Sequence, residues 1–167
     1  VFAGEAFTQA PLTLDQSVIT DLLTQMEVGM IEDGTTVGMG LATAVKRLQV
    51  SEAESKVVVL LTDGRSNTGE IGPVTAAQMA QALDMKVYTI GVGSRGTARV
   101  PVDDPIVGRR YISMQVDVDE PTLREVAETT GGRYFRATDR ESLAQIYSEI
   151  DALETTEIEV QNFTSYG

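Results

Sequence analysis

Two short segments that lie far apart in the sequence carry oxygen-bearing side chains that could bind a metal ion. Asp63 follows the run Lys56–Leu61, whose β-branched and apolar residues predict a strand buried on both faces. Thr35 lies in the loop 33–38, just before a predicted helix. Because ligands bind outside the carboxyl ends of parallel strands, we expect Thr35 and Asp63 to converge at that edge. A hydroxyl and a carboxylate suit Mg²⁺, although the same residues beside glycine are also common in ordinary turns.

The composition limits the chemistry that is available. The chain of 167 residues contains no cysteine and no histidine. These absences exclude disulfides, imidazole metal ligands, and catalysis of the Ser-His-Asp or Cys-His type. A bound metal would therefore be held by oxygen, which favours Mg²⁺, Ca²⁺ or Mn²⁺. The formal net charge of −12 argues against nucleic acid as a partner, because phosphate binding needs clustered Lys and Arg.

The length and the start of the sequence suggest one domain taken from a longer protein. A chain of this size corresponds to about one domain. The sequence begins at Val1 without a methionine or a charged leader, so we interpret it as a fragment. No apolar stretch approaches the ~18 residues that a membrane-spanning helix needs.

Strands and helices are predicted to alternate along the chain. Apolar runs predict strands at Val1–Phe7, Lys56–Leu61, Lys86–Gly93 and Arg133–Ala137. Periodic apolar residues between capping and breaking residues predict helices at 14–26, 37–48, 73–84, 119–131 and 138–153. This alternation indicates right-handed βαβ units and a mostly parallel sheet. The segment 99–116 differs, because two β-rich arms around a turn predict a β-hairpin insertion.

The ends of two helices carry specific signals. Thr13-x-x-Gln16 and Thr138-x-x-Glu141 match the capping box, in which the threonine caps the helix. In the first helix, one apolar stripe is predicted from residues spaced by four, namely Leu14, Val18, Leu22 and Met26. The division of the chain is a domain at 1–153 and a loosely ordered tail at 154–167.

Two other motifs have simpler interpretations. Gly91-x-Gly93-x-x-Gly96 matches the dinucleotide fingerprint in its letters, but a hairpin-like segment follows it instead of the required helix. Asp117-Val118-Asp119-Glu120 resembles the start of a calcium loop, but the later ligands and the glycine of an EF-hand are missing. We interpret the first motif as a loop that leaves a sheet and the second as a helix cap.

Three segments together resemble a von Willebrand factor type A (vWA) domain, over residues 1 to about 153. They are Gly34-Thr35-Thr36-Val37-Gly38 with Ala42-x-x-x-Lys46-Arg47-Leu48, then Val58–Gly64, then Val87–Gly93. Three further features are similar to bacterial Bat (aerotolerance) proteins of the BatA or BatB type. These are the opening Val-Phe-Ala-Gly-x-Ala-Phe, the insertion 103–110, and Ala127-x-x-Thr130-Gly131-Gly132-x-Tyr134-Phe135.

The resemblance implies an α/β fold, a three-layer Rossmann-like sandwich, with a metal-ion-dependent adhesion site at the carboxyl edge of its sheet. In the family this site uses an Asp-x-Ser-x-Ser loop, a threonine and an aspartate. Thr35 matches the threonine and Asp63 matches the aspartate. Asp33 and Thr36 are close in sequence, but the Gly-Thr-x-Val-Gly register favours Thr35. Gly34, Gly38 and Gly64 would permit close backbone approach at the site.

This sequence departs from the family pattern, because it contains no Asp-x-Ser-x-Ser. The family's first strand and ligand loop would lie upstream of Val1, and we expect them to exist outside these residues; a strand from a second chain is the alternative. Without that strand, a gap is expected between the Val1–Phe7 and Lys56–Leu61 strands. With two of five ligands, Mg²⁺ (or Mn²⁺ or Ca²⁺) is expected to bind weakly or not at all in this chain.

The function implied by the resemblance is divalent-cation-dependent binding of a protein, without catalysis. The partner would supply a carboxylate as the last metal ligand, and the parent protein would be anchored in the bacterial inner membrane with this domain on the periplasmic side. Other Bat proteins are the implied partners, with a MoxR-type AAA+ ATPase as a further candidate. Two alternatives stay open: a metal-free scaffold, in which Asp63 only shapes a turn, and a small α/β hydrolase.

Overall fold

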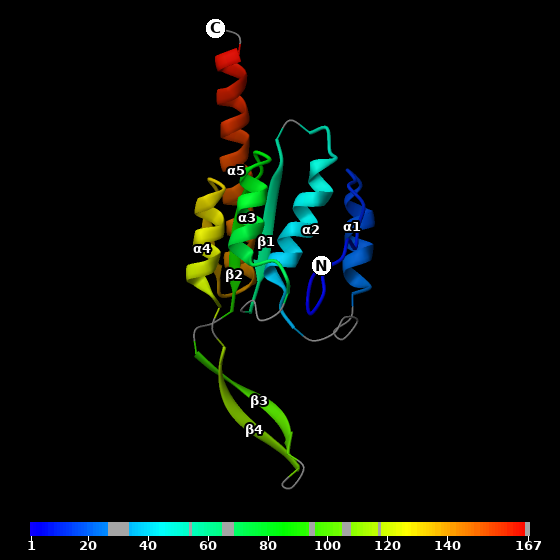
Figure 1. Ribbon diagram of the computed structural model, residues 1–167, viewed down its shortest axis with the longest axis vertical. Coiled ribbons are helices and arrows are strands. Elements are labelled where there is room, and N and C mark those ends of the chain that lie inside the picture. Colours follow the sequence, from blue (N-terminus) through cyan, green and yellow to red (C-terminus); the bar gives the residue numbers. More distant parts are fainter. Residues whose placement is uncertain are drawn as a thin grey trace.

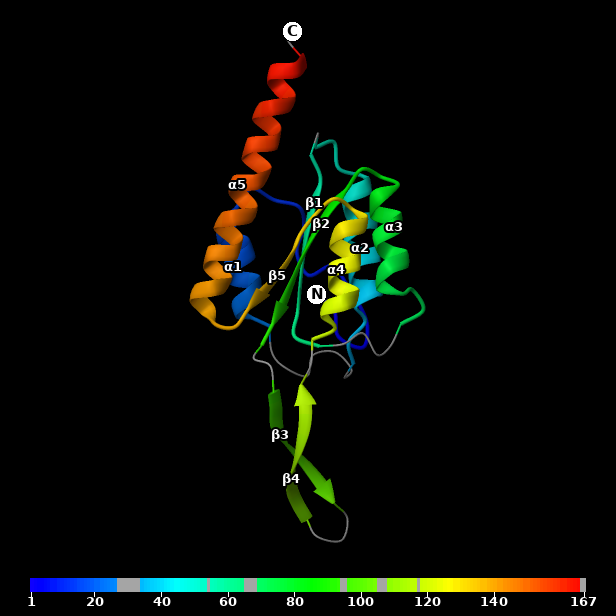
Figure 2. The same ribbon diagram turned by 90° about the vertical axis from the view of Figure 1, so that its left-hand side faces the viewer.

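A computed structural model of the chain describes residues 1–26, 34–53, 55–64, 69–93, 96–104, 108–116 and 118–165. Of residues 96–104, 108–116 and 156–165 it describes the backbone alone. A parallel sheet of three strands lies between two layers of helices (Figures 1 and 2). The expected three-layer, Rossmann-like α/β fold is therefore confirmed.

The sheet consists of β1 (Val57–Thr62), β2 (Lys86–Val92) and β5 (Tyr134–Ala137), in the order β1-β2-β5. Both pairings are parallel. The central strand β2 is buried along almost its whole length, as its apolar sequence predicts. In β1, however, only alternate residues are buried, and Leu61 is 39% exposed. The prediction that β1 is buried on both faces is therefore correct for one face only, because on the other Val57 and Val59 are half-buried against the second core and Leu61 is left uncovered.

One face of the sheet is covered by α2 (Val37–Gln49), α3 (Pro73–Gln81) and α4 (Glu120–Thr129). These helices agree with the predicted ones to within three residues at each end. The helix α4 begins as expected, with Asp119 accepting a hydrogen bond from the Thr122 backbone N–H (3.3 Å). The core of this layer includes Leu41, Val45, Val58, Leu60, Val87, Leu123 and Val126. Burial of each such side chain stabilises the fold by roughly 1.5–3 kcal/mol.

The other face is covered by α5 (Arg140–Ser165), with α1 (Gln16–Thr24) in the same layer (Figure 2). Ile146 and Ile150 of α5 pack against Tyr88 and Ile90 of β2. Since successive residues of a strand alternate between faces, β2 supplies both cores, with Val87 on one face and Tyr88 on the other.

The predicted insertion is an antiparallel hairpin of β3 (Gly96–Asp104) and β4 (Gly108–Val116). It begins three residues earlier than expected. The hairpin leaves the carboxyl end of β2, returns to the start of α4, and extends away from the rest of the molecule in both views (Figures 1 and 2).

The segment Val1–Phe7 is not the predicted strand. It folds back on itself through an isolated antiparallel bridge between Phe2 and Ala6. The Val1 amino group donates a hydrogen bond to the Phe7 carbonyl (3.1 Å), and the Phe7 N–H donates to the Val1 carbonyl (3.0 Å). The Ala3 N–H donates to the Glu5 carbonyl (2.8 Å). The turn around Gly4 satisfies locally the groups that a sheet would otherwise satisfy. The expected gap between two strands is thus replaced by a loop beside α2.

The first helix also differs from its prediction. It begins at Gln16, and Asp15 caps it by accepting bonds from the Ser17 backbone N–H (2.9 Å) and the Ser17 hydroxyl (2.6 Å). These bonds, the side-chain one foremost, hold the pKa of Asp15 below its ordinary value. The predicted apolar stripe is wrong in its N-terminal half, because Leu14 is fully exposed and Val18 is 38% exposed. No residue of α1 is fully buried.

The last helix starts and ends later than expected. Asp139, and not Thr138, accepts from the Ser142 backbone N–H (2.7 Å), while the Ser142 hydroxyl accepts from the Asp139 N–H (3.1 Å). The bond from the Ser142 N–H, followed by that from the Thr138 hydroxyl, lowers the pKa of Asp139. The helix continues to Ser165, so the tail predicted to be loosely ordered is helical. The domain boundary at residue 153 stays a prediction.

Candidate functional site

The structure brings Thr35 next to the segment that contains Asp63. Asp63 follows the carboxyl end of β1, and Thr35 precedes the first turn of α2. A Cβ atom built on Gly64 would lie 3.1 Å from the Thr35 Oγ1 and 3.5 Å from its Cγ2. The Thr35 side chain therefore lies directly against the backbone of the residue after Asp63. Thr35 and the segment that contains Asp63 thus lie at one edge of the sheet, while a shared metal site for the two side chains stays a prediction.

The neighbouring Thr36 has a different role. It is 1% exposed, and both its hydroxyl and its backbone N–H donate to the Ala3 carbonyl at 2.8 Å. Its hydroxyl is therefore committed to the N-terminal loop. Of the two threonines, Thr35 is the one placed against Gly64, which agrees with the register chosen from the sequence. Asp33 lies outside the described residues.

A short turn presents Asp63 to solvent. The Thr62 side chain is buried, and its hydroxyl accepts a hydrogen bond from the Gly64 N–H (3.3 Å). This local bond fixes the backbone on both sides of Asp63. Asp63 itself is exposed, so its carboxylate is accessible to a cation or to another protein.

Two glycines at this edge lie in close packing. Gly64 leaves the space that Thr35 occupies. At Gly38 an added Cβ would collide with the carbonyl oxygen of Ile71, so the loop before α3 lies directly on the first turn of α2. The expected close approach of two backbones is present at Gly38, where the partner is the loop before α3, whereas the close neighbour of Gly64 is the Thr35 side chain.

The described residues include two oxygen donors of the kind that a cation site uses. Thr35 offers a hydroxyl and Asp63 a carboxylate, both of them oxygen ligands of the kind that Mg²⁺ accepts. In the described parts of the chain, no cluster of three or more acidic residues could hold a metal ion. The donor set fits a weakly held, largely hydrated cation better than a closed protein cage.

Arg136 is a residue at the same edge that the sequence did not reveal. Its guanidinium donates to the Gly93 carbonyl through Nε (3.0 Å) and Nη2 (2.8 Å), and to Glu120 Oε1 through Nη1 (2.8 Å). Gly93 precedes the hairpin and Glu120 follows it, so Arg136 joins the two roots of the hairpin to β5. The segment Arg133–Ala137 reads as an ordinary strand, and no local signal marks this long-range contact.

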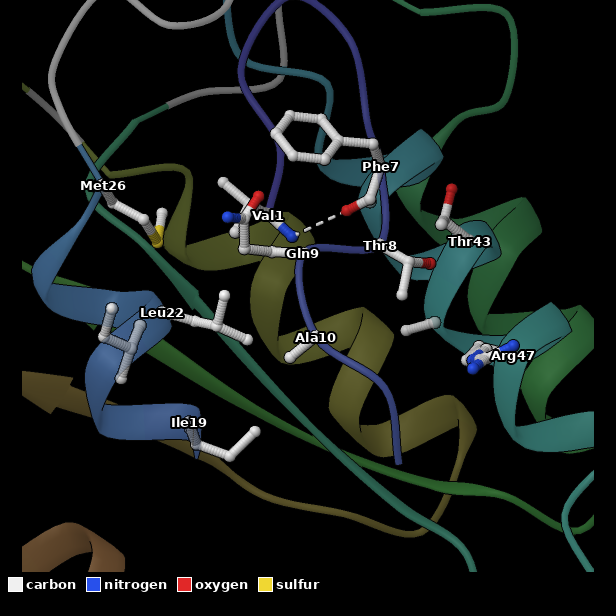
Figure 3. Close-up of a pocket in the computed structure, with 13 residues that line it drawn as sticks. Val1, Phe7, Thr8, Gln9, Ala10, Ile19, Leu22, Met26, Thr43 and Arg47 are labelled. Carbon is white, nitrogen blue, oxygen red and sulfur yellow. Dashed lines mark hydrogen bonds between the residues drawn. The ribbon is translucent and has the colours of Figure 1, made fainter. Parts of the chain in front are cut away.

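A separate cavity of about 290 Å³ lies between the N-terminal segment, α1 and α2 (Figure 3). Figure 3 shows Ile19, Leu22 and Met26 on the α1 side, with Thr43 and Arg47 on the α2 side. The lining is mainly apolar and includes neither Thr35 nor Asp63. The cavity is therefore distinct from the candidate cation site.

The two weaker motifs take the simpler roles that were expected. Gly96, the last glycine of the apparent dinucleotide fingerprint, begins strand β3, so no helix follows to hold a phosphate. Asp119 caps α4. Asp117 lies outside the described residues.

A three-layer α/β fold, with a threonine and an aspartate at the carboxyl edge of its sheet, defines the class of domain. Residues 1–149 match the family described as von Willebrand factor type A domain. The chain belongs to this family.

Within this family, the chain is similar to several individual proteins. The chain is 31% identical over 140 residues to an uncharacterised protein of Borreliella burgdorferi, covering 83% of this chain and 40% of that protein. Thus it spans less than half the length of this relative. It is similar to the structure of BatB from Bacteroides thetaiotaomicron, a conserved hypothetical protein (TM-score 0.73, 27% identity, 92% of this chain and 77% of that one). It is also similar to an aerotolerance-related membrane protein from Bacteroides fragilis (TM-score 0.70, 28% identity, 87% and 73%).

One more distant structure contains a metal. Proximal thread matrix protein 1 from the mussel byssus was solved with a zinc-occupied adhesion-site motif (TM-score 0.66, 92% of this chain and 33% of that one). At 22% identity this likeness concerns the fold alone. In the part of the chain that the structure describes, each helix is too short or too polar to cross a membrane.

Proposed function

We propose that this chain is a protein-interaction domain that binds its partner through a divalent cation at the Thr35–Asp63 edge. The observation that carries the proposal is the contact between the Thr35 side chain and Gly64, the residue after Asp63, because it supports a shared site for two oxygen-bearing side chains from distant segments. Membership of the vWA family and similarity to Bat-type structures support an interaction role. No catalysis is proposed.

The cation would be Mg²⁺ or Mn²⁺, held by the Thr35 hydroxyl directly or through water. Asp63 would act mainly through a bound water, which it would orient while offsetting part of the metal charge. A cation at this edge would attract a carboxylate of the partner, in spite of the acidity of the chain. Because only two ligands come from the described residues, the partner or further residues of the parent protein would complete the coordination.

We propose other Bat-type proteins as binding partners, and a MoxR-type AAA+ ATPase as a further one, with the parent protein anchored in the bacterial inner membrane and this domain on the periplasmic side. The similarity to an aerotolerance-related membrane protein supports the membrane location.

Titration calorimetry of the parent protein with Mg²⁺ and Mn²⁺ tests the cation site. Thr35→Val and Asp63→Asn should each weaken binding about tenfold or more, because each removes one oxygen ligand and, at Asp63, a charge. Thr36→Val and Asp84→Asn are the matched controls. The first removes the adjacent buried hydroxyl, and the second removes an exposed carboxylate that follows α3. Equal binding by all four variants would overturn the proposal.

Two other outcomes correspond to the alternatives. If the parent protein, with the residues that complete its site, binds neither cation and Asp63→Asn only lowers its stability, Asp63 shapes a turn in a metal-free scaffold. Hydrolysis of a generic ester that is abolished in Asp63→Asn would instead indicate an enzyme.

A further inference from the structure

The β3–β4 hairpin is the part of the molecule whose role the cation site leaves unexplained. It forms its own two-stranded sheet, separate from the main one. A hairpin of two strands without a covering layer is only marginally stable in water. Within the described chain its strands contact each other, and no helix or third strand covers them. Such an element is stabilised when something binds it.

The strand register gives the hairpin two unlike faces. Paired residues of an antiparallel ladder share a face, and successive pairs alternate between faces. One face receives the apolar pairs Ala98–Met114 and Val100–Ile112 and, beyond them, the mixed pair Val102–Arg110. The opposite face receives mostly polar pairs, namely Thr97–Gln115, Arg99–Ser113, Pro101–Tyr111 and Asp103–Arg109.

The two outer edges of the hairpin are also unequal. Proline has no N–H, so Pro101 and Tyr111 form a pair that exchanges no hydrogen bonds. The backbone polar groups of such a pair point away from the partner strand, toward the two outer edges of the hairpin. The outer edge of β3 therefore lacks a donor at its centre, which blocks an added strand. The edge of β4 contains no proline, and it presents outward N–H groups at Tyr111, at Ser113 and at the alternate residues on either side.

Charge indicates what kind of segment this edge would accept. Residues 96–116 contain three arginines and two aspartates, a net charge of +1, within a chain whose net charge is −12. At about 3.4 Å per residue, strands of nine residues reach about 30 Å, several times the screening length of about 8 Å at physiological ionic strength. The electrostatic potential at the hairpin is thus largely independent of the acidic main body of the domain. The hairpin of a second copy would carry the same positive charge and would be repelled.

The roots of the arm are fixed at the same edge as Thr35 and Asp63. Arg136 bonds to Gly93 before β3 and to Glu120 after β4, and its side chain is 17% exposed. A guanidinium that makes three hydrogen bonds in one plane holds its partners in a defined geometry. Arg136 is a positioning residue that sets the base from which the hairpin leaves the domain.

We infer that the hairpin is a second contact for the partner, and that its occupant is an acidic, extended protein segment that adds as a strand along the outer edge of β4. Alternating apolar and acidic residues in that segment would continue the apolar face and meet the arginines of the arm. The inference deepens the proposed function, because a partner held at the cation would lie beside the arm, but it is tested by separate contacts.

The test uses the whole chain and two labelled nine-residue peptides, matching the length of β4. One peptide alternates Val with Glu, and the other alternates Val with Lys. Fluorescence anisotropy should show binding of the acidic peptide alone. Hydrogen exchange of the chain should then slow at the Tyr111 and Ser113 amides.

Matched variants locate the binding edge. Ser113→Pro removes an outward donor from β4 and should weaken binding about tenfold or more. Thr97→Pro makes the same change on the β3 edge, which Pro101 already blocks, and should bind as the unchanged chain does. Reversing the charge of Arg109 and Arg110 to Glu should also weaken binding, whereas the same reversal at Lys46 and Arg47, exposed on α2, should have little effect.

The opposite results are equally specific. Equal binding of both peptides, no binding of either, or equal loss in Ser113→Pro and Thr97→Pro would overturn the inference. So would concentration-dependent dimerisation lost in Ser113→Pro, which would make a second copy the occupant, or binding of the arm to lipid vesicles in place of the peptide. Mg²⁺ titration of Ser113→Pro separates the two proposals, because a hairpin that fails to bind leaves cation binding unchanged.

Discussion

At the scale of single residues, two adjacent threonines illustrate how similar side chains acquire different tasks. Thr36 is buried and bonds to Ala3, which attaches the N-terminal loop to α2. Thr35 is one residue earlier and lies against Gly64 at the exposed edge. The two residues are of the same type, so the direction of the backbone before α2 decides that Thr36 has a structural hydroxyl and that Thr35 is the proposed ligand.

Gly38→Ala should destabilise the domain by about 1–3 kcal/mol, because the new methyl group would collide with the Ile71 carbonyl and neither backbone can move freely. Gly72→Ala is the control, since its Cβ would meet only the Thr75 Oγ1, at an ordinary 3.9 Å. Urea denaturation compares the two variants. Equal midpoints for Gly38→Ala and the unchanged chain would show that the loop does not lie on α2.

At the scale of elements, α5 is attached to the sheet beyond the predicted end of the domain. Glu154 Oε1 accepts from Tyr88 Oη (2.6 Å) and from Lys86 Nζ (3.0 Å), both on β2. The Lys86 and Glu154 side chains are 18% and 17% exposed, so their ion pair is partly shielded from water. Through these contacts Glu154 attaches α5 to β2, although the sequence placed this residue in a loosely ordered tail.

Truncation after Leu153 should therefore cost about 1–3 kcal/mol relative to truncation after Thr155, since it leaves Lys86 and Tyr88 without this carboxylate. The two truncations differ by two residues, so helix length is nearly matched. Glu154→Gln in the whole chain should show a loss in the same direction. Identical unfolding curves for the two truncations would support the boundary predicted at residue 153.

At the scale of the whole molecule, the negative net charge opposes folding and favours the binding of cations. A net charge of −12 on 167 residues produces repulsion that salt screens. The same charge attracts divalent cations in general, and the proposed Thr35–Asp63 site would bind one of them specifically. General screening and specific binding can be separated, because only the second depends on Asp63.

Thermal unfolding should shift upward from low to moderate NaCl for the unchanged chain and for Asp63→Asn alike. At matched ionic strength, Mg²⁺ should add a further shift in the unchanged chain alone, worth about 1.4 kcal/mol when free Mg²⁺ is ten times the Kd. Calorimetric scans in the two salts measure both effects. A magnesium-specific shift that persists in Asp63→Asn would place the cation elsewhere.

The sequence by itself determined the parts of the fold that depend on local patterns. The buried strand β2 follows from an apolar run, the start of α4 from Asp119 and Pro121, and the hairpin from two β-rich arms. The position of Thr35 beside the segment that contains Asp63 was also predictable, because parallel strands end at one edge and the motif spacing resembles a known family. Each of these signals lies within a few residues of the feature that it predicts.

The tertiary structure alone decided the remainder. Val1–Phe7 has the composition of a strand but forms a loop, because no strand of the described chain pairs with it. Asp15 and Asp139 replace the predicted threonine caps. The Arg136 contact with Gly93 spans 43 residues, and that of Glu154 with Tyr88 spans 66. Such contacts depend on how β2, β5 and α5 come together in space, which no short stretch of sequence encodes.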